Sequence, residues 1–111
     1  MRRSRGDIWF VDLTDARGHE QSGMRPAVVL AVAYGGMTIV VPLTTTPAAF
    51  GFPHTHSIEK SSENGLSSDS AALVFQIVAL SQDRFVRKIG RCPGGDMEAI
   101  SVLLKDLLSL E

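Results

Sequence analysis

Two valine-rich apolar segments separated by a pair of glycines limit the possible folds of this chain more than any other feature. The segments are residues 27–34 and 37–43, and Gly35 and Gly36 lie between them. Because glycines accept the positive φ angles of tight hairpin turns, the pattern predicts two antiparallel strands. Both segments are almost continuously apolar rather than alternating. We therefore expect a sheet that is covered on both faces.

Further strands are expected on either side of this hairpin. Residues 7–13, 55–59 and 87–91 are short strand-like segments between polar or glycine-containing turns. Residues 70–80 could form one long strand or a buried helix, and their valine and isoleucine content favours the strand.

The C-terminal segment has the pattern of an amphipathic helix, with Asp96 as its expected N-cap. Apolar residues recur there at steps of three and four: Met97, Ile100, Leu103, Leu104, Leu107 and Leu108. We predict a mainly β fold, a small and partly open barrel of about five to seven mostly antiparallel strands with a C-terminal helix.

The composition fits one folded domain spanning residues 1–111, with 44% hydrophobic and 21% charged residues. No apolar run is long enough to span a bilayer, and the arginine-containing start lacks the apolar core of a signal peptide. The single cysteine, Cys92, has no disulfide partner in the chain. We expect a cytoplasmic protein without membrane association, in which Cys92 is a buried thiol rather than a nucleophile.

The charged residues are distributed unevenly. The net charge of −1 excludes a globally basic nucleic-acid binder, and no Asp, Glu, Lys or Arg occurs between Arg25 and Glu59. The basic residues of interest lie toward the two ends of the chain: Arg2, Arg3, Arg5, Arg17 and Arg25, then Arg84, Arg87, Lys88 and Arg91. A local basic surface would form if the fold brought these ends together; otherwise they are separate solvated charges.

Two polar loops contain the groups most suited to chemistry. Residues 14–25 include Arg17, His19, Glu20, Gln21 and Arg25, and residues 44–56 include Thr44, Thr45, Thr46, His54 and His56. Loops of this kind beside a rigid sheet are frequent places for function. If the two loops meet at one rim of the barrel, they form a polar site on an otherwise apolar body.

Metal-free RNA cleavage fits these groups better than a metal site or a cofactor. His54 and His56 have no third ligand at a suitable spacing, and the sequence contains no HExxH, paired cysteines, P-loop or GxSxG. Cleavage by the ribose 2′-OH needs a proton acceptor, a proton donor and a cation that holds the extra phosphate charge. Arg25 suits the cation, Thr44 can donate to the phosphate, and Glu20 could position or deprotonate the 2′-OH.

Four stretches resemble the MazF/PemK family of toxins in the same order along the chain. The stretch RGHEQSGMRP resembles the family's G-x-E-Q-x-x-x-R-P loop, matched at Gly18, Glu20, Gln21, Arg25 and Pro26. The others are Arg5–Ile8, similar to R-G-D-[IV], Val41–Thr45, similar to a strand ending in a catalytic Thr, and Asp69-Ser70 with Gln76-Ile77.

The resemblance implies an SH3-like or CcdB-like barrel that forms a homodimer and binds single-stranded RNA in a groove. It implies a sequence-selective mRNA interferase, the toxin of a type II toxin–antitoxin system, inhibited by a cognate antitoxin. Arg25 and Thr44 would be the catalytic pair, helped by Glu20. The expected RNA-binding residues are Arg17, His19, Gln21, Thr45, Thr46, His54 and Gln76, and no metal is expected.

Simpler interpretations remain open for each of these residues. Arg25 and Glu20 could form an ordinary loop salt bridge, and His54 could be a surface residue. Trp9 and Phe10 could stack on bases, although core or dimer packing is favoured. His19 stands where the family commonly has a small residue, and it could be the acid or base itself.

Two other functions also fit such a fold. One is a non-catalytic CcdB-like toxin that binds DNA gyrase, and the other is a catalytically inactive RNA- or protein-binding module. The pairing of Arg25 with Thr44 favours the endoribonuclease, because a gyrase binder does not need it.

Overall fold

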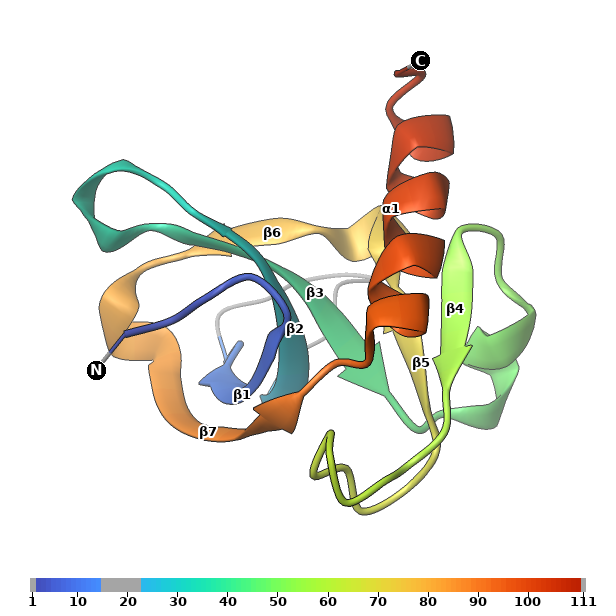
Figure 1. Cartoon of the computed structure of the whole chain (residues 1–111), viewed down its shortest axis with the longest axis horizontal. Coiled ribbons are helices and arrows are strands. Elements are labelled where there is room, and N and C mark those ends of the chain that lie inside the picture. The colour runs from blue at the N-terminus through green and yellow to red at the C-terminus, as the bar shows by residue number, and fades with distance from the viewer. Residues whose placement is uncertain (1, 15–22, 111) are drawn as a thin grey trace.

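The computed structural model describes residues 2–14 and 23–110 (Figure 1). The strands are β1 (Asp7–Asp12), β2 (Met24–Val32), β3 (Thr38–Thr44), β4 (Thr55–Ile58), β5 (Ser70–Leu73), β6 (Val78–Leu80) and β7 (Phe85–Arg91). The helix α1 (Gly94–Leu107) follows, and the short 3-10 turns are η1 (Tyr34–Gly36), η2 (Pro47–Gly51), η3 (Val74–Gln76) and η4 (Gln82–Arg84). Within these ranges the prediction of a mainly β fold with a C-terminal helix is confirmed.

All strand pairs are antiparallel, and the sheet order is β4-β5-β3-β2-β1-β7. Strand β3 is shared, because its first half pairs with β6 and its last two residues pair with β5. The sheet curls into a partly open barrel (Figure 1), and α1 packs beside β4 and η3. The predicted hairpin is present, and Gly35 and Gly36 have φ angles of 72° and 80°.

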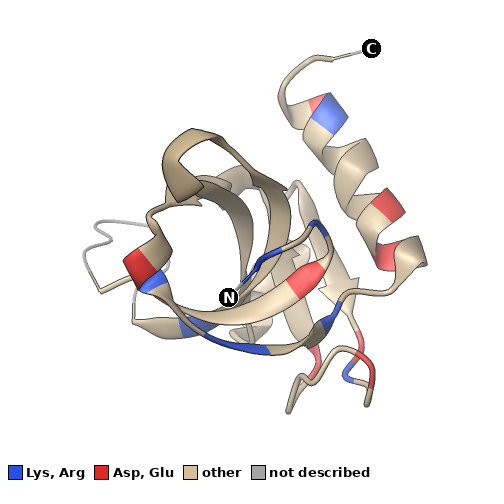
Figure 2. Ribbon diagram, turned by 60° about the vertical axis from the view of Figure 1, so that its left-hand side comes forward, with Lys and Arg blue, Asp and Glu red and all other residues tan. Residues whose placement is uncertain are grey.

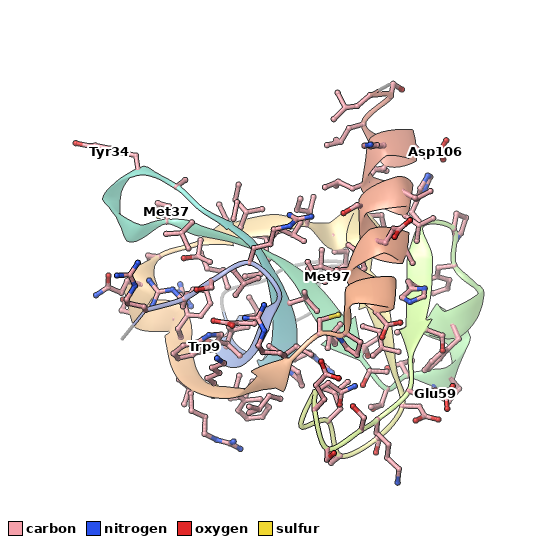
Figure 3. All side chains as sticks on the ribbon, viewed as in Figure 1. Trp9, Tyr34, Met37, Glu59, Met97 and Asp106 are labelled. Atoms are coloured by element: carbon pink, nitrogen blue, oxygen red, sulfur yellow. The ribbon has the colours of Figure 1, made fainter. Side chains whose placement is uncertain are left out.

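The continuous apolar runs are explained by two cores on opposite faces of the sheet. Val28 and Val41 belong to a cluster beneath α1, whereas Val29 and Val40 belong to the barrel interior around Trp9. Figure 3 shows Trp9 inside the barrel and Met97 on the helix side. Neighbouring residues on one strand therefore serve different cores, which confirms the expectation of a sheet covered on both faces.

The prediction of one continuous element over residues 70–80 is wrong. The register pairs Leu43 with Ala72 but Val40 with Val78. Leu43 and Val40 are three residues apart on β3, whereas their partners Ala72 and Val78 are six residues apart. Continuous antiparallel pairing would require equal separations, so the partner segment contains three extra residues. The extra residues form η3, Val74–Gln76, which leaves the sheet and turns toward α1.

The prediction of Asp96 as the helix N-cap is also wrong. Helix α1 begins at Gly94, with Pro93 at the N-cap, so that Asp96 lies within the first turn. Its carboxylate lies 2.7 Å from Nε2 of His56 on β4, and near the other end of the helix Asp106 lies 2.8 Å from Nε2 of His54. Asp96 still places a negative charge at the helix N-terminus, where it is favourable, and the two pairs join α1 to the sheet.

The basic ends of the chain do come together, because β1 pairs with β7. Figure 2 shows basic segments along β7 and in the N-terminal segment that precedes β1. Several of these basic side chains, however, already form ion pairs or hydrogen bonds within the protein. Arg91 and Lys88 lie 2.6 and 3.3 Å from Asp7, and Arg5 donates to the Leu30 carbonyl at 3.0 Å.

Asp7 is the buried centre of this charge network. Burial acts to raise its pKa, but the hydrogen bond from the Ser4 backbone amide, with those from Trp9 and Lys88, outweighs burial and lowers the pKa below 3.8. A carboxylate with a lowered pKa stabilises the folded state above pH 3.8, and that stability is lost as the pH falls through its folded-state pKa.

We expect Asp7→Ala to reduce the free energy of unfolding by about 2–3 kcal/mol at pH 7, because it leaves buried donors unpaired. The larger losses of fully buried ion pairs do not apply, since Lys88 and Arg91 are about half exposed. Urea unfolding at pH 7 and below pH 4 measures the effect, which should shrink at the lower pH. Glu98→Ala, at an exposed helix position, is the control; equal stability of the two variants at pH 7 would contradict the network.

Candidate active site

A pocket of about 150 Å³ lies where the ends of β1, β2 and β3 meet the loop between β4 and β5. Its lining consists of Phe10, Arg25, Pro26, Leu43, Thr44, Thr45, Leu66, Ser67, Ser68 and Ser70. Four of these side chains are apolar, five carry hydroxyls, and one is a cation. The pocket therefore offers apolar surface, hydroxyl groups that both donate and accept hydrogen bonds, and a positive charge.

The register of the β2–β3 hairpin brings Arg25 and Thr44 together. Ala27 pairs with Pro42, so continuing the antiparallel pairing by two residues places Arg25 opposite Thr44. On its other side Arg25 pairs with Val11 of β1. The two residues predicted as the catalytic pair thus line one pocket because the hairpin, with a register shift of one residue between Val29 and Ala31, places them opposite each other.

The Thr44 side chain is buried and belongs to a small hydroxyl pair. It is 2% exposed, and its Oγ1 donates to Oγ1 of Thr46 at 3.1 Å. The same oxygen accepts a hydrogen bond from the Thr46 backbone amide at 3.3 Å. This short turn ends β3 and directs the chain toward η2, so that Thr45 faces the pocket.

The serine wall of the pocket depends on Asn64, which is fully buried. Its Oδ1 accepts hydrogen bonds from the amides of Ser61 and Leu66, both at 3.0 Å, and its Nδ2 donates to the Glu59 carbonyl at 2.8 Å. These bonds shape the turn that presents residues 66–68 to the pocket. Sequence reasoning missed this wall; the Asn64-Gly65 turn followed by a cluster of serines was the available signal.

Four of the predicted site residues lie outside the described residues: Arg17, His19, Glu20 and Gln21. The ends of their loop are fixed, because the Leu13 amide donates to the Gly23 carbonyl at 2.9 Å, and β2 begins at Met24. Arg25 follows directly after this point.

His54 and Gln76 do not line the pocket. His54 precedes β4 and contacts Asp106 of α1, and Gln76 lies in η3, which packs against α1. Both residues lie on the helix side of the molecule. The pairing of β4 with β5 positions His54 there, and the extra turn η3 positions Gln76 there. Their predicted contacts with RNA stay predictions.

Cys92 is buried, as expected from the sequence. Burial, together with the nearby carboxylates of Asp96 and Glu63, raises the pKa of its thiol to about 12. Within residues 2–14 and 23–110, no three His, Cys, Asp or Glu side chains gather in a group that could hold a metal ion. The described part of the chain also has no helix of the length and apolarity needed to cross a membrane.

Comparison with solved structures defines the class of fold. The crystal structure of MazF from Deinococcus radiodurans matches with a TM-score of 0.82 and 23% identity over 97% of each chain. An endoribonuclease in complex with its cognate antitoxin from a mycobacterial species matches with a TM-score of 0.75 and 21% identity, covering 99% of this chain and 98% of that one. The partly open barrel with its terminal helix is therefore a MazF-type fold.

Sequence comparison gives the family. The profile of the PemK-like, MazF-like toxin of type II toxin–antitoxin systems matches residues 4–108. Endoribonuclease MazF9 of Mycobacterium tuberculosis is 35% identical over 115 residues, which cover 96% of each protein. Endoribonuclease EndoA of Bacillus subtilis is 29% identical over 109 residues, covering 96% of this chain and 94% of EndoA. This chain belongs to the PemK/MazF family of toxins, and its class is that of a toxin endoribonuclease, as the sequence motifs predicted.

Proposed function

We propose that the pocket cleaves single-stranded RNA through attack of a ribose 2′-OH on the adjacent phosphate, without a metal ion. The observation that carries this proposal is the placement of Arg25 and Thr44 on opposite strands of one hairpin, in a single pocket whose lining includes five hydroxyl side chains. A cation and hydroxyl donors are what a phosphate with developing negative charge needs.

The reaction forms a bond from O2′ to phosphorus and breaks the bond from phosphorus to O5′. The 2′-OH gives up its proton to a base, and the departing O5′ takes up a proton, which leaves a 2′,3′-cyclic phosphate and a 5′-OH. The Arg25 guanidinium stabilises the charge that builds on the phosphate oxygens, and it keeps its proton throughout. Thr44 reaches the same oxygens by rotating its hydroxyl away from Thr46.

The proton transfers are assigned to the loop between β1 and β2. Glu20 is the proposed base or 2′-OH positioning group, and His19 is the alternative acid or base, on the strength of the sequence alone. Arg17, Gln21, Thr45 and Thr46 are proposed RNA-binding residues. His54 and Gln76 can contact RNA only where the strand extends from the pocket toward α1.

The proposed partners are a second copy of this chain and a cognate antitoxin. The mycobacterial neighbour was solved with its cognate antitoxin, and we infer that an antitoxin segment covers the pocket of this protein as well. Exposed apolar residues, among them Tyr34 at 98%, Val102 at 60% and Phe52 at 47%, provide surface for such contacts. Figure 3 shows Tyr34 pointing away from the body of the molecule. A cytoplasmic location follows from the proposed mRNA substrate.

The test is to incubate the purified protein with a mixed pool of single-stranded RNA in EDTA and to sequence the ends of the fragments. We expect 5′-OH ends, which polynucleotide kinase phosphorylates without prior phosphatase treatment, and 2′,3′-cyclic phosphate ends. A requirement for Mg²⁺, or 5′-phosphate ends, would refute the mechanism. Failure to cut any RNA would favour the inactive binding module or the gyrase binder.

A further inference from the structure

We propose that Phe10 and Arg87 form a shelf that holds a nucleobase next to the scissile phosphate. This inference rests on the proposed RNA cleavage and adds a specificity-determining contact to it. The shelf consists of one half-buried aromatic ring at the pocket and one exposed guanidinium over that ring.

The shelf is part of a row of residues that crosses four adjacent strands. Phe10 of β1 pairs with Pro26 of β2 on one side and with Arg87 of β7 on the other. Continuing the pairing of Ala27 with Pro42 places Leu43 opposite Pro26. Phe10, Pro26 and Leu43 line the pocket, and the guanidinium carbon of Arg87 lies 5.2 Å from the centre of the Phe10 ring.

The apolar side chains of this row offer no hydrogen bond to a phosphate or to the hydroxyls of a ribose. A nucleobase has apolar faces and a polar edge, and it matches a pocket lined by both apolar side chains and hydroxyls. Stacked on Phe10, a base would direct its edge toward Thr45, Ser67 and Ser68, whose hydroxyls can each donate or accept.

Phe10 is more exposed than the neighbouring apolar residues of β1. Ile8 and Val11 are fully buried, and Trp9 is 1% exposed and makes an edge contact with Phe85 at 5.9 Å. Phe10 is only half-buried and lines the pocket. The core therefore uses Ile8, Trp9 and Val11, and the Phe10 ring keeps surface that a ligand can cover.

Arg87 also differs from the basic residues near it. Lys88 and Arg91 pair with Asp7, whereas among the described residues Arg87 makes no ion pair and lies over the Phe10 ring. A guanidinium plane stacks on bases and also binds phosphate. Arg87 can therefore contact a base that lies against the part of the Phe10 ring left open to the pocket, and hold the next phosphate along the RNA.

The experiment compares an RNA oligonucleotide that contains the mapped cleavage site with two matched oligonucleotides, each abasic at one of the nucleotides flanking the scissile bond. We expect Phe10→Leu to lower kcat/KM about 10-fold on the intact RNA, mainly through KM, because base–aromatic stacking is lost. On one of the abasic substrates the same substitution should have almost no effect. Phe10→Tyr, which keeps the ring, should restore most of the activity.

Arg87→Ala should show the same dependence on that base, with a loss of about 5-fold, because it removes a contact to the stacked base. Lys105→Ala removes an exposed positive charge from α1 and is the matched control, for which no change is expected. Thermal unfolding of each variant establishes that it is folded. Equal losses for Phe10→Leu on the intact and both abasic substrates, or no loss on any of them, would overturn the shelf.

Binding measurements separate this inference from the proposed catalysis. A fluorescent pool of mixed-sequence oligonucleotides with 2′-deoxyribose at every position cannot be cut by 2′-OH attack, so fluorescence anisotropy reports binding alone. If Phe10→Leu weakens its binding while the wild type fails to cut the ribose form, the shelf stands and the catalytic proposal fails. If the wild type neither binds nor cuts, both are refuted.

Discussion

Arg25→Ala is expected to reduce RNA cleavage by roughly a thousand-fold while the fold is kept. In phosphoryl-transfer sites a charge-stabilising arginine contributes this much or more, because it acts on charge that develops only in the transition state. Arg25 lines the pocket at the second position of β2 and is opposite Thr44 in the extended register. The measurement is kcat/KM on a single-site oligonucleotide, with thermal unfolding recorded for the same sample.

Two further variants make the result specific. Arg25→Lys keeps the charge but loses the planar fork that matches two phosphate oxygens, so we expect it to recover only part of the lost activity. Arg2→Ala removes an arginine at an exposed position of the N-terminal segment and should leave activity unchanged. Cleavage by Arg25→Ala at the wild-type rate would refute the role assigned to this residue, and the same loss in Arg2→Ala would show only a dependence on net charge.

Arg25 and Thr44 could be predicted to lie at the same end of one hairpin, because Gly35 and Gly36 mark the turn that joins the two apolar runs. Their exact pairing could not be predicted from the turn, because the register shifts by one residue between Val29 and Ala31, and the register at the turn alone would place Arg25 opposite Thr45. The family resemblance then assigned the chemistry, which register alone does not provide.

The turn at Asn64 is local, but the position of the serine wall could not be predicted, because it also depends on a contact distant in sequence. Asn64 binds three backbone groups within five residues of it, whereas Gly65 lies against Ile89 of β7. Sequence pattern identifies a turn at Asn64-Gly65, but it does not identify the strand against which the turn packs. The break at η3 has the same origin, since it is set by the offset between two segments that share β3.

The placement of His54 shows a third limit of sequence reasoning. A histidine in a polar loop near three threonines looks like a site residue. In the structure the chain turns between Thr46 and β4, and His54 is paired with an aspartate on α1. Proximity in sequence therefore indicated the wrong neighbour, and only the packing of α1 on β4 identifies the correct one.

Gly65→Ala is expected to reduce the free energy of unfolding by about 4 kcal/mol, a large part of the stability of a domain of this size. A Cβ at Gly65 would lie 1.9 Å from the backbone carbonyl oxygen of Ile89, and the residue has a φ of +70°. Backbone cannot rotate away as a side chain can, so the loop must leave β7. Thermal unfolding should show a melting temperature lower by at least about 10 °C.

Three other glycines separate the close contact from the backbone angle. Gly90 does not have a positive φ, but a Cβ added there would lie 2.4 Å from the Asn64 backbone. Gly90→Ala should therefore reduce the free energy of unfolding by about 3 kcal/mol through the close contact alone. Gly35 has a φ of +72° and open space around it, so Gly35→Ala should cost about 1 kcal/mol through the angle alone. Gly95 has neither constraint and lies in the first turn of α1, where alanine should be neutral or slightly stabilising.

The same series tests whether the loop forms part of the active site. The loop that Gly65 and Gly90 hold against β7 carries Leu66, Ser67 and Ser68 to the pocket. At a temperature at which every variant is folded, Gly90→Ala should therefore cleave RNA more slowly than Gly35→Ala, although both carry one added methyl group. Equal activity of the two variants, together with a lower stability of Gly90→Ala, would show that the serine wall contributes to the fold and not to catalysis.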